Sequence, residues 1–395
     1  MRALKIGVDA TSWENPRGYG RFARNVIRRL VELDNTTTVR LYIDEVTAAT
    51  ADLPDGAEVR LVPLSQSAVE ARADSSRRVV DLIRLARAVR RKEVDAFFFP
   101  SDYTYFPVIG VPTLVGVHDA IATELPELTL SPGRARFLWN VKRRFALARA
   151  TRIFTVSEAA RDAIADVLGI PPDTVAVVPE APDPIFSPRP RETTDQELPK
   201  LGLAAGEPFF LFAGGISPHK NVETLIEAYA RLDDLEPRPK LVIVGSLDGG
   251  PYLSSAVVIK EAIDRHGLGD SVVLPGFITD EALACLYSAS TATVLPSLAE
   301  GFGLPAVEAA ACGSPLVLSD LPAHRENLGS AALYFPARDV DGLAGQLRRV
   351  SEDEALRTDL GVRGQAAAAR LSWDTAAERV HELLMGIAHK NGNGR

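Results

Sequence analysis

Cysteine and methionine are scarce in this 395-residue chain, which has two of each. Two cysteines cannot build a disulfide scaffold. Cys285 and Cys312 fall in the apolar stretches 282–289 and 306–313, which we predict to be helical. We therefore expect two free, buried thiols in a protein of a reducing compartment.

Long apolar runs are also lacking, since none approaches the roughly 18 residues that a membrane-spanning helix needs. Residues 1–5 lead directly into a predicted strand and do not resemble the apolar core of a signal peptide. With 46% hydrophobic and 24% charged residues, the composition is that of a globular chain long enough for two domains. We expect a cytoplasmic protein.

The net charge of −8 is divided unevenly, because residues 1–180 hold 25 basic and 23 acidic residues and the remainder 19 and 29. Basic residues concentrate in residues 72–92, with eight against two acidic, and in residues 134–152, with seven and no acidic. Without a nucleic-acid-binding motif, DNA and RNA are not expected partners. Two interpretations stay open: solvated helix faces, or peripheral docking on the anionic inner leaflet of a membrane or on an anionic acceptor.

The first basic stretch has helical periodicity, with an apolar stripe and a basic face. The predicted inward stripe consists of Val79, Leu82, Ile83, Ala86 and Val89, and the predicted basic face of Arg77, Arg84, Arg87 and Arg91.

Strand-like apolar segments alternate with helical segments along the chain, which predicts parallel sheets covered by helices. The first series is Leu4–Ala10, Val39–Ile43, Glu58–Leu64, Asp95–Phe99, Thr113–His118, Thr151–Val156 and Thr174–Val178, and the second is Phe209–Ala213, Lys240–Val244, Ser271–Leu274, Ala292–Leu295 and Pro315–Leu318. The proline-rich segment 182–190 can be neither helix nor central strand, so we place the interdomain linker there. We predict two Rossmann-like α/β domains that face each other, with ligands in the cleft at the carboxyl ends of the strands.

The most informative segment is 296–308, PSLAEGFGLPAVE, in which Glu300 and Glu308 flank a glycine loop. A buried strand is predicted just before it, and Pro305 is tolerated in the first turn of a helix. Glycines before a helix amino end expose backbone N–H groups that attract an anion, most often phosphate. Glu308, about one turn into that helix, could accept the two hydroxyls of a ribose. The segment therefore predicts a nucleotide site.

Two more segments follow predicted strands and can reach the same cleft. Gly214 and Gly215 let the backbone approach a ligand, and Lys220 adds a positive charge at the mouth of the next helix. His118 ends an apolar strand and is followed by Asp119. A lone histidine in such a place is ordinarily structural.

A third segment, 15–23, opens the first long helix with Gly18 and Gly20 and also invites a phosphate. It matches the G-x-G-x-x-A dinucleotide pattern, with Asp44 at the end of the next strand. That fingerprint needs its first glycine directly after the strand, whereas eight residues separate Asp9 from Gly18. An NAD(P)-dependent oxidoreductase is therefore the alternative, which binding of NAD or NADP but not of sugar nucleotides would favour.

Together these motifs resemble the retaining glycosyltransferases of family 4, which have the two-domain GT-B architecture, and the resemblance covers nearly the whole chain. Its most specific element is the E-x7-E signature at Glu300 and Glu308. Further matches are the glycine loop before Arg21, His118-Asp119, residues 218–221, residues 319–322 with Glu326 and Gly329, and residues 372–374. The resemblance implies an acceptor-binding domain over residues 1–185, rejoined by a last helix at 373–390, and a donor-binding domain over residues 186–372.

The resemblance also implies roles for particular residues in transfer from a nucleoside diphosphate sugar. Glu300 would lie near the transferred sugar, His118 would hydrogen-bond it, and Lys220 would meet the diphosphate; these are the implied catalytic residues. Glu308 would hold the ribose. The other implied donor-binding residues are Gly20, which would approach the diphosphate from the first domain, Gly214 and Gly215, the backbone donors Gly301, Phe302, Gly303 and Leu304, and Phe277 and Ile278, which would flank the base.

Such a transfer needs stabilisation of the leaving diphosphate, which Lys220 and backbone N–H groups could supply without a metal ion or other cofactor. Asp339 and Asp341 form a D-x-D pair, but they open an amphipathic helix, where capping is the commoner role. A GT-B sugar-nucleotide epimerase or phosphorylase stays possible.

Two stretches, 321–326 and 331–335, resemble family members that build bacterial surface polysaccharides with mannose or rhamnose. GDP-mannose is therefore our first choice of donor, with UDP- or dTDP-sugars possible, and the acceptor would be a glycan, a lipid-linked molecule or a small molecule. The chain departs from the family pattern at residues 180–183, Glu-Ala-Pro-Asp, where many members have Asn-Gly-Val-Asp.

Overall fold

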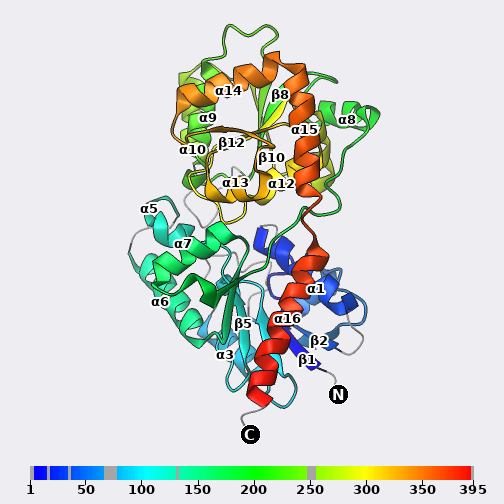
Figure 1. Cartoon of the computed structure of the whole chain (residues 1–395), viewed down its shortest axis with the longest axis vertical. Helices are drawn as coiled ribbons and strands as arrows, with labels where there is room; N and C mark the ends of the chain where they lie inside the picture. Colours follow the sequence, from blue (N-terminus) through cyan, green and yellow to red (C-terminus); the bar gives the residue numbers. More distant parts are fainter. Residues whose placement is uncertain are drawn as a thin grey trace. The chain divides into compact units, whose positions relative to one another are not determined.

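The structure, a computed structural model, describes residues 4–15, 18–33, 37–65, 78–129, 133–246 and 255–392, which Figure 1 shows coloured along the sequence. The chain divides into two compact units. The first unit consists of Met1–Ala120, Pro132–Glu180 and Ser372–Arg395, and the second of Ile121–Ser131 and Ala181–Leu371. The amino-terminal part of the first basic stretch, up to Arg77, lies outside the described residues, as do Pro16 and Arg17 of the first glycine loop.

The described strands of the first unit form one parallel sheet in the order β3-β2-β1-β4-β5-β6-β7. They are β1 (Leu4–Asp9), β2 (Thr37–Ile43), β3 (Glu58–Leu61), β4 (Ala96–Phe99), β5 (Thr113–Gly116), β6 (Arg152–Thr155) and β7 (Val175–Val177). The central strand β4 is a continuous apolar run, as expected of a strand that helices cover on both faces. The strand order reverses between β1 and β4, and such a switch point is where ligands bind in sheets of this kind.

The described helices of the first unit cover both faces of this sheet (Figure 1). They are α1 (Gly18–Leu33), α2 (Glu45–Thr50), α3 (Val79–Ala88), η1 (Asp102–Thr104), α6 (Arg134–Arg149), α7 (Glu158–Leu168), η2 (Pro172–Thr174) and α16 (Trp373–Gly392). The last helix, α16, packs beside α1, where the rings of Trp373 and Phe22 are 5.9 Å apart. Arg29 Nε of α1 also lies 2.7 Å from Asp374 Oδ1 of α16.

The described strands of the second unit form a parallel sheet in the order β10-β9-β8-β11-β12-β13. They are β8 (Phe209–Ala213), β9 (Lys240–Val244), β10 (Val272–Gly276), β11 (Ala292–Leu295), β12 (Leu316–Ser319) and β13 (Leu333–Phe335). Here the order reverses between β8 and β11, so the carboxyl ends of these two strands define the switch point.

The second unit also contains helices on either side of its sheet. The described ones are α4 (Ile121–Glu124), α5 (Pro126–Thr129), α8 (Arg191–Glu197), η3 (Leu198–Leu201), η4 (Pro218–Lys220), α9 (Val222–Ala230), α10 (Ala256–Arg265), α11 (Asp280–Ala289), α12 (Leu304–Ala311), α13 (Pro322–Leu328), α14 (Val340–Glu352) and α15 (Glu354–Ala368).

The predicted fold class of two parallel α/β sheets is confirmed, and each predicted strand segment overlaps a strand. Three of the predicted strands, β8, β9 and β11, match residue for residue. The strand β13 was not predicted, although it ends the apolar run Ala-Ala-Leu-Tyr-Phe at residues 331–335.

The prediction for the inward stripe of α3 is wrong in part. Val79 and Ile83 are 70% and 44% exposed, whereas Asp81 and Leu85 are buried. The cause is Asp81, whose carboxylate accepts hydrogen bonds from the backbone N–H and the hydroxyl of Ser65, at 2.9 and 2.5 Å. A buried carboxylate must be hydrogen-bonded, so this contact fixes the rotation of the helix.

The second basic stretch exposes fewer charges than its composition suggests. Lys142 Nζ donates to the carbonyl of Tyr103, at 2.6 Å. Arg143 is buried, where its Nη2 donates to the carbonyl of Asp119 at 2.6 Å and its Nε lies 3.4 Å from Asp102 Oδ2. Two of the cations of α6 therefore join this helix to residues 102–103 and 119 of the first unit.

The two cysteines are free and buried, as expected. Burial raises the pKa of Cys312 to about 12, so this thiol stays protonated at neutral pH. None of the helices in the described part combines the length and the apolar character that a bilayer-spanning segment needs.

Candidate functional site

Two loops lie side by side at the switch point of the second sheet. One follows β8 and contains Gly214, Gly215 and Lys220, and the other follows β11 and contains Glu300 and the glycines before α12. Because β8 and β11 are hydrogen-bonded parallel neighbours, their carboxyl ends open on the same edge of the sheet.

Direct hydrogen bonds join these two loops. The backbone N–H of Leu298 donates to the carbonyl of His219, at 2.8 Å. Asn221 Nδ2 donates to the carbonyl of Pro296 at 3.0 Å and to that of Ala337 at 2.7 Å. Asn221 holds a left-handed conformation, with φ 56°, which asparagine tolerates better than most residues. The loops therefore form one connected element.

An ion pair between the loops places the two most prominent sequence-predicted side chains together. Lys220 Nζ lies 2.7 Å from Glu300 Oε1, and the hydroxyl of Ser297 donates to the same oxygen at 2.6 Å. The side chains of Lys220 and Glu300 are only 17% and 8% exposed. Burial alone would raise the pKa of Glu300, but the nearby ammonium and these hydrogen bonds lower it to about 2. Glu300 is therefore ionised at neutral pH.

The helix α12 begins directly after the glycine loop, as predicted. Its N-cap is Gly303, in a left-handed conformation with φ 84°, and Pro305 lies in its first turn. Phe302 and Leu304 are buried beside it, and Glu308 is 4% exposed on α12. The eight-residue helix thus directs its amino end toward the loop that carries Glu300.

Sequence analysis missed His324 of α13, which lies directly behind this loop. A Cβ atom at Gly303 would be 2.9 Å from His324 Cδ2. His324 Nδ1 is 2.9 Å from the carbonyl oxygen of Ser319, which can only accept, so Nδ1 carries the proton. Its Nε2 is buried and has no hydrogen-bond partner among the described residues. Burial lowers the pKa of His324, despite the opposing effect of Glu300, and favours a neutral ring.

A second residue of α13 supports the same loop. Asn327 Nδ2 donates to the carbonyl of Phe302, at 2.7 Å. His324 and Asn327 are three residues apart and therefore share a face of the helix. That i, i+3 spacing of two polar residues is the signal that the sequence offered, although it does not name the loop that they contact.

The glycines after β8 differ in what surrounds them. A Cβ atom at Gly214 would make ordinary contact with Phe212, at 3.5 Å. A Cβ atom at Gly215 would meet no described atom within 4 Å, so packing within the described protein gives no reason for glycine at this position.

Phe277 and Ile278 follow β10, at the same edge of the second sheet. Phe277 is 74% exposed, which is unusual for an aromatic side chain.

The first unit holds His118 just beyond β5, where it is 8% exposed. Its Nε2 donates to the carbonyl of Pro100 at 2.8 Å, and its Nδ1 lies 3.3 Å from Glu180 Oε1. Burial alone would lower the pKa of His118, but the contacts with Glu180 and Pro100 raise it overall. Both ring nitrogens thus have partners within the first unit, and the departure from the family pattern at Glu180 supplies one of them.

Gly20 lies in the first turn of α1, where glycine has a packing reason. A Cβ atom at Gly20 would be 2.1 Å from the carbonyl oxygen of Asn15, which no side chain could tolerate. His118 and Gly20 belong to the first unit, and Lys220, Glu300 and Glu308 belong to the second.

The D-x-D pair has local partners. Asp339 is the N-cap of α14 and accepts a hydrogen bond from the backbone N–H of Gly342 at 2.8 Å, as predicted. Asp341 forms an ion pair with Arg231. Within the described residues, no group of three or more histidine, cysteine or acidic side chains is arranged to hold a metal ion.

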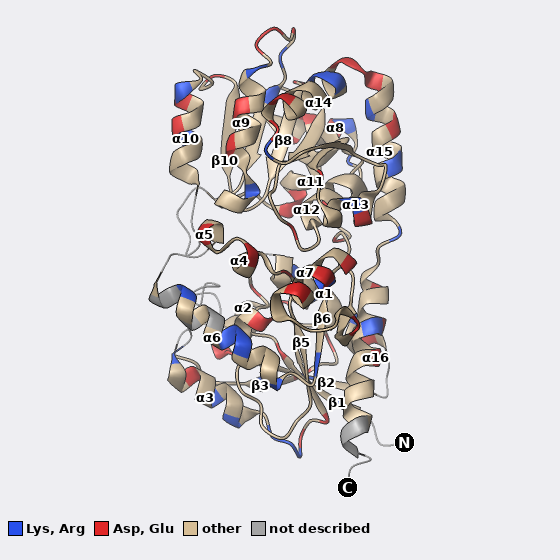
Figure 2. Cartoon of the chain, turned by 60° about the vertical axis from the view of Figure 1, so that its left-hand side comes forward, with Lys and Arg blue, Asp and Glu red and all other residues tan. Residues whose placement is uncertain are grey.

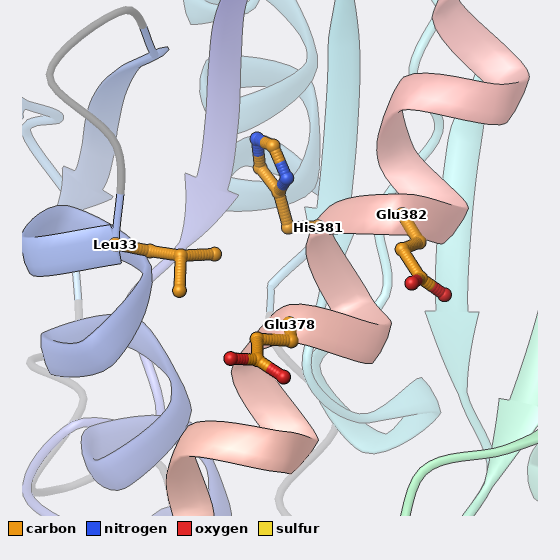
Figure 3. A pocket seen from close by; sticks show the side chains of 4 residues that line it. All are labelled: Leu33, Glu378, His381 and Glu382. Carbon is orange, nitrogen blue, oxygen red and sulfur yellow. The ribbon is translucent and has the colours of Figure 1, made fainter.

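A hollow between α1 and α16 lies elsewhere in the first unit (Figure 3). It is lined by Leu33, Glu378, His381 and Glu382, none of which sequence analysis singled out. His381 Nε2 lies 3.1 Å from the hydroxyl of Thr37, which ties α16 to β2. The hollow is thus a feature of helix packing and not part of the candidate site.

Two family models match the chain. The model described as Glycosyltransferase Family 4 matches residues 16–184, and the model described as Glycosyl transferases group 1 matches residues 193–367. O-antigen chain mannosyltransferase B of Escherichia coli is 26% identical over 90% of this chain and 93% of that protein. D-inositol 3-phosphate glycosyltransferase of Streptomyces bingchenggensis is 32% identical over 58% of this chain and 51% of its own length.

A solved structure with the same fold is that of HepE from Anabaena in complex with UDP-glucose. It superimposes with a TM-score of 0.74 over 97% of this chain and 99% of that chain, at 18% sequence identity. At this identity the likeness shows the fold alone, which is GT-B.

Replacing Lys220 by methionine should destabilise the protein, because the Glu300 carboxylate would stay buried without its cation. We expect Lys220→Met to lower the free energy of unfolding by about 3 to 5 kcal/mol at pH 7, measured by urea denaturation. Lys220→Met combined with Glu300→Gln should lose less than Lys220→Met alone. As a control, Arg348→Met breaks the exposed pair with Asp234 and should cost at most about 1 kcal/mol. If the double variant were less stable than Lys220→Met, the unpaired Glu300 carboxylate would not be the cause of the destabilisation.

Stability should depend on pH through His118. Because folding raises its pKa, the interaction with Glu180 stabilises the protein fully below the ordinary histidine pKa of 6.5 and is lost as pH rises through the raised value. The difference in unfolding free energy between the wild type and His118→Gln should therefore shrink from pH 6 to pH 9. His266→Gln, at an exposed position, is the control. If the difference in unfolding free energy between the wild type and His118→Gln did not change with pH, the contact between His118 and Glu180 would not contribute to stability as proposed.

Proposed function

Because the chain belongs to glycosyltransferase family 4 and has the GT-B fold, we propose that it transfers a hexosyl group from a nucleoside diphosphate sugar. The group would be mannosyl or rhamnosyl, and transfer would retain the anomeric configuration without a metal ion. The acceptor would be a glycan, a lipid-linked molecule or a small molecule.

The observation that carries this proposal is the buried Lys220–Glu300 pair at the switch point of the second sheet. A primary ammonium is held there between two glycine loops, close to the amino end of α12. An ammonium, free backbone donors and a helix amino end are the groups that bind a diphosphate. In this proposal Lys220 meets the diphosphate, Glu300 lies beside the transferred sugar, and Glu308 of α12 holds the ribose.

The proposed reaction breaks the bond between the anomeric carbon and the diphosphate oxygen, and forms a bond from that carbon to the acceptor oxygen on the same face. The acceptor proton passes to the departing phosphate. Negative charge grows on the leaving group, so Lys220 and the N–H groups of Gly301–Leu304 would stabilise the transition state. His118 would hydrogen-bond the sugar by exchanging one of its present partners.

The base and the sugar of the donor are proposed from separate observations. The exposed ring of Phe277, at the edge where ligands bind in such sheets, offers a surface on which a base could stack, with Ile278 next to it. Similarity to a mannosyltransferase over nearly the whole chain favours GDP-mannose. A UDP-sugar is the second candidate, since HepE, which shares the fold, was solved with UDP-glucose.

The family gives the oxidoreductase alternative no support, because both family models describe glycosyltransferases. An epimerase or phosphorylase with the same fold would use the same diphosphate site. It would differ in product, since it would release a rearranged sugar nucleotide or a sugar phosphate instead of a glycoside.

Thermal unfolding with GDP-mannose, UDP-glucose, dTDP-rhamnose and NAD tests this function. We expect one sugar nucleotide to raise Tm, since a ligand of the native state stabilises by mass action, by about 2.7 kcal/mol at a hundredfold excess over Kd. NAD should leave Tm unchanged. With the binding donor and a panel of acceptor glycans, mass spectrometry should detect a glycoside, and EDTA should not abolish its formation. A Tm shift with NAD alone would overturn the proposal.

Substitutions of two glycines should distinguish an effect on donor binding from an effect on stability. Gly215→Ala meets no described atom, so it should leave Tm unchanged while weakening donor binding about tenfold or more, because the added methyl would lie where the diphosphate passes. Gly303→Ala should lower Tm even without donor, since it combines φ 84° with a contact to His324. Donor titration and thermal unfolding give both values. Unchanged affinity in Gly215→Ala would move the diphosphate away from that loop.

A further inference from the structure

The outer side of α6 carries large apolar side chains that face solvent. Phe137, Val141 and Phe145 are 68%, 49% and 42% exposed. Their spacing of four residues places them along one line of the helix. Helices on a water-facing surface normally turn such residues inward, so this line requires a partner or a function.

The neighbouring helix α3 extends this apolar surface. Val79, Val80 and Ile83 of α3 are 70%, 53% and 44% exposed. Leu85 of α3 and Ala146 of α6 belong to one core cluster, so both helices cover the same face of the sheet and their outer sides face the same direction. We call this surface, formed by the exposed residues of α3 and α6, the α3–α6 face.

The charge of the α3–α6 face and of the turn after α3 is positive, and Figure 2 shows lysine and arginine on both helices. The exposed cations are Arg78, Arg84, Arg87, Arg90, Arg91, Lys92, Arg144 and Arg149, of which Arg84 lies 3.2 Å from Asp81 and Arg90 lies 3.9 Å from Glu93. The acidic residues nearby point inward or are paired, since Asp81 is buried and Glu93 lies 3.0 Å from Arg40. The guanidinium of Arg149 lies 5.4 Å from the ring centre of Phe145, so charge and apolar surface adjoin.

We propose that the α3–α6 face docks on an anionic phospholipid surface. The aromatic and aliphatic side chains would enter the boundary between headgroups and acyl chains, while the arginines meet the lipid phosphates. A second copy of the chain fits less well, because a two-fold contact through this face would bring arginines against arginines. The proposal needs neither the donor site nor the transfer reaction. If the proposed function also holds, this docking would give the enzyme access to a lipid-linked acceptor.

Sedimentation with lipid vesicles tests the docking. The full chain should pellet with phosphatidylcholine vesicles that contain about 30% phosphatidylglycerol, much less with phosphatidylcholine alone, and less again at about 0.5 M salt, which screens the arginines. Equal binding to neutral vesicles, or no binding to anionic ones, would overturn the proposal.

Variants locate the contact. Phe137→Ser, Val141→Ser and Phe145→Ser combined should weaken binding to anionic vesicles at least about tenfold, since three inserting groups are lost. Val257→Ser with Val362→Ser, at positions 66% and 61% exposed on the second unit, is the matched control and should bind like the wild type. Tm should stay unchanged in the control and fall modestly in the triple variant, because Phe145 also contacts the ring of the core residue Tyr105.

Two further readouts separate the possible outcomes. The triple variant should keep the donor-induced Tm shift, so loss of vesicle binding and loss of donor binding can be told apart. Analytical ultracentrifugation without lipid should give the same mass for the wild type and the triple variant. A wild-type dimer that the triple variant abolishes would assign the face to a second copy instead.

Discussion

The buried ion pair between Lys220 and Glu300 is the constraint on which the second unit's site depends. Both side chains are mostly removed from water, at 17% and 8% exposed, and that desolvation is compensated because the atoms lie 2.7 Å apart and Ser297 donates a further hydrogen bond. The pair joins the loops after two adjacent strands. If either loop moved away, a largely buried charge would lose its partner. Hydrogen bonds from Leu298 and Asn221 join the same two loops, so these contacts connect segments that are about 80 residues apart in sequence.

Next to these two loops, the buried imidazole of His324 is kept neutral. His324 is buried with its Nδ1 proton on a backbone carbonyl, and burial lowers its pKa. A protonated ring at this place would compete with Lys220 for Glu300 in a site with little water. The neutral ring instead packs against Gly303, which only a glycine permits at that distance and φ value. A histidine of a different helix thus explains why residue 303 is a glycine.

How much of this the sequence could predict depended on whether the deciding contact was local. The strands, the family and the helix start at Pro305 follow from apolar runs, glycines and prolines that act within a few residues, and these predictions are confirmed. The rotation of α3 could not be predicted, because Asp81 bonds to Ser65, which is 16 residues away and follows another strand. The place of His324 was equally hidden, since its contact with Gly303 exists only after α13 packs beside α12. The roles of Glu308, Gly20 and Phe277 stay predictions, because they concern a ligand and not the fold.

The two units use one electrostatic arrangement with different residues. In the second, an ammonium after β8 pairs with a buried carboxylate after β11. In the first, the imidazole after β5 pairs with Glu180, which follows β7 and departs from the family pattern. In the second unit, the Glu300 carboxylate neutralises the Lys220 ammonium. In the proposed function, a diphosphate would have the electrostatic advantage over Glu300 at Lys220, because it carries more negative charge than a carboxylate. At His118 a neutral sugar hydroxyl has no such advantage over Glu180, so the partner that the proposed sugar contact would exchange is the carbonyl of Pro100.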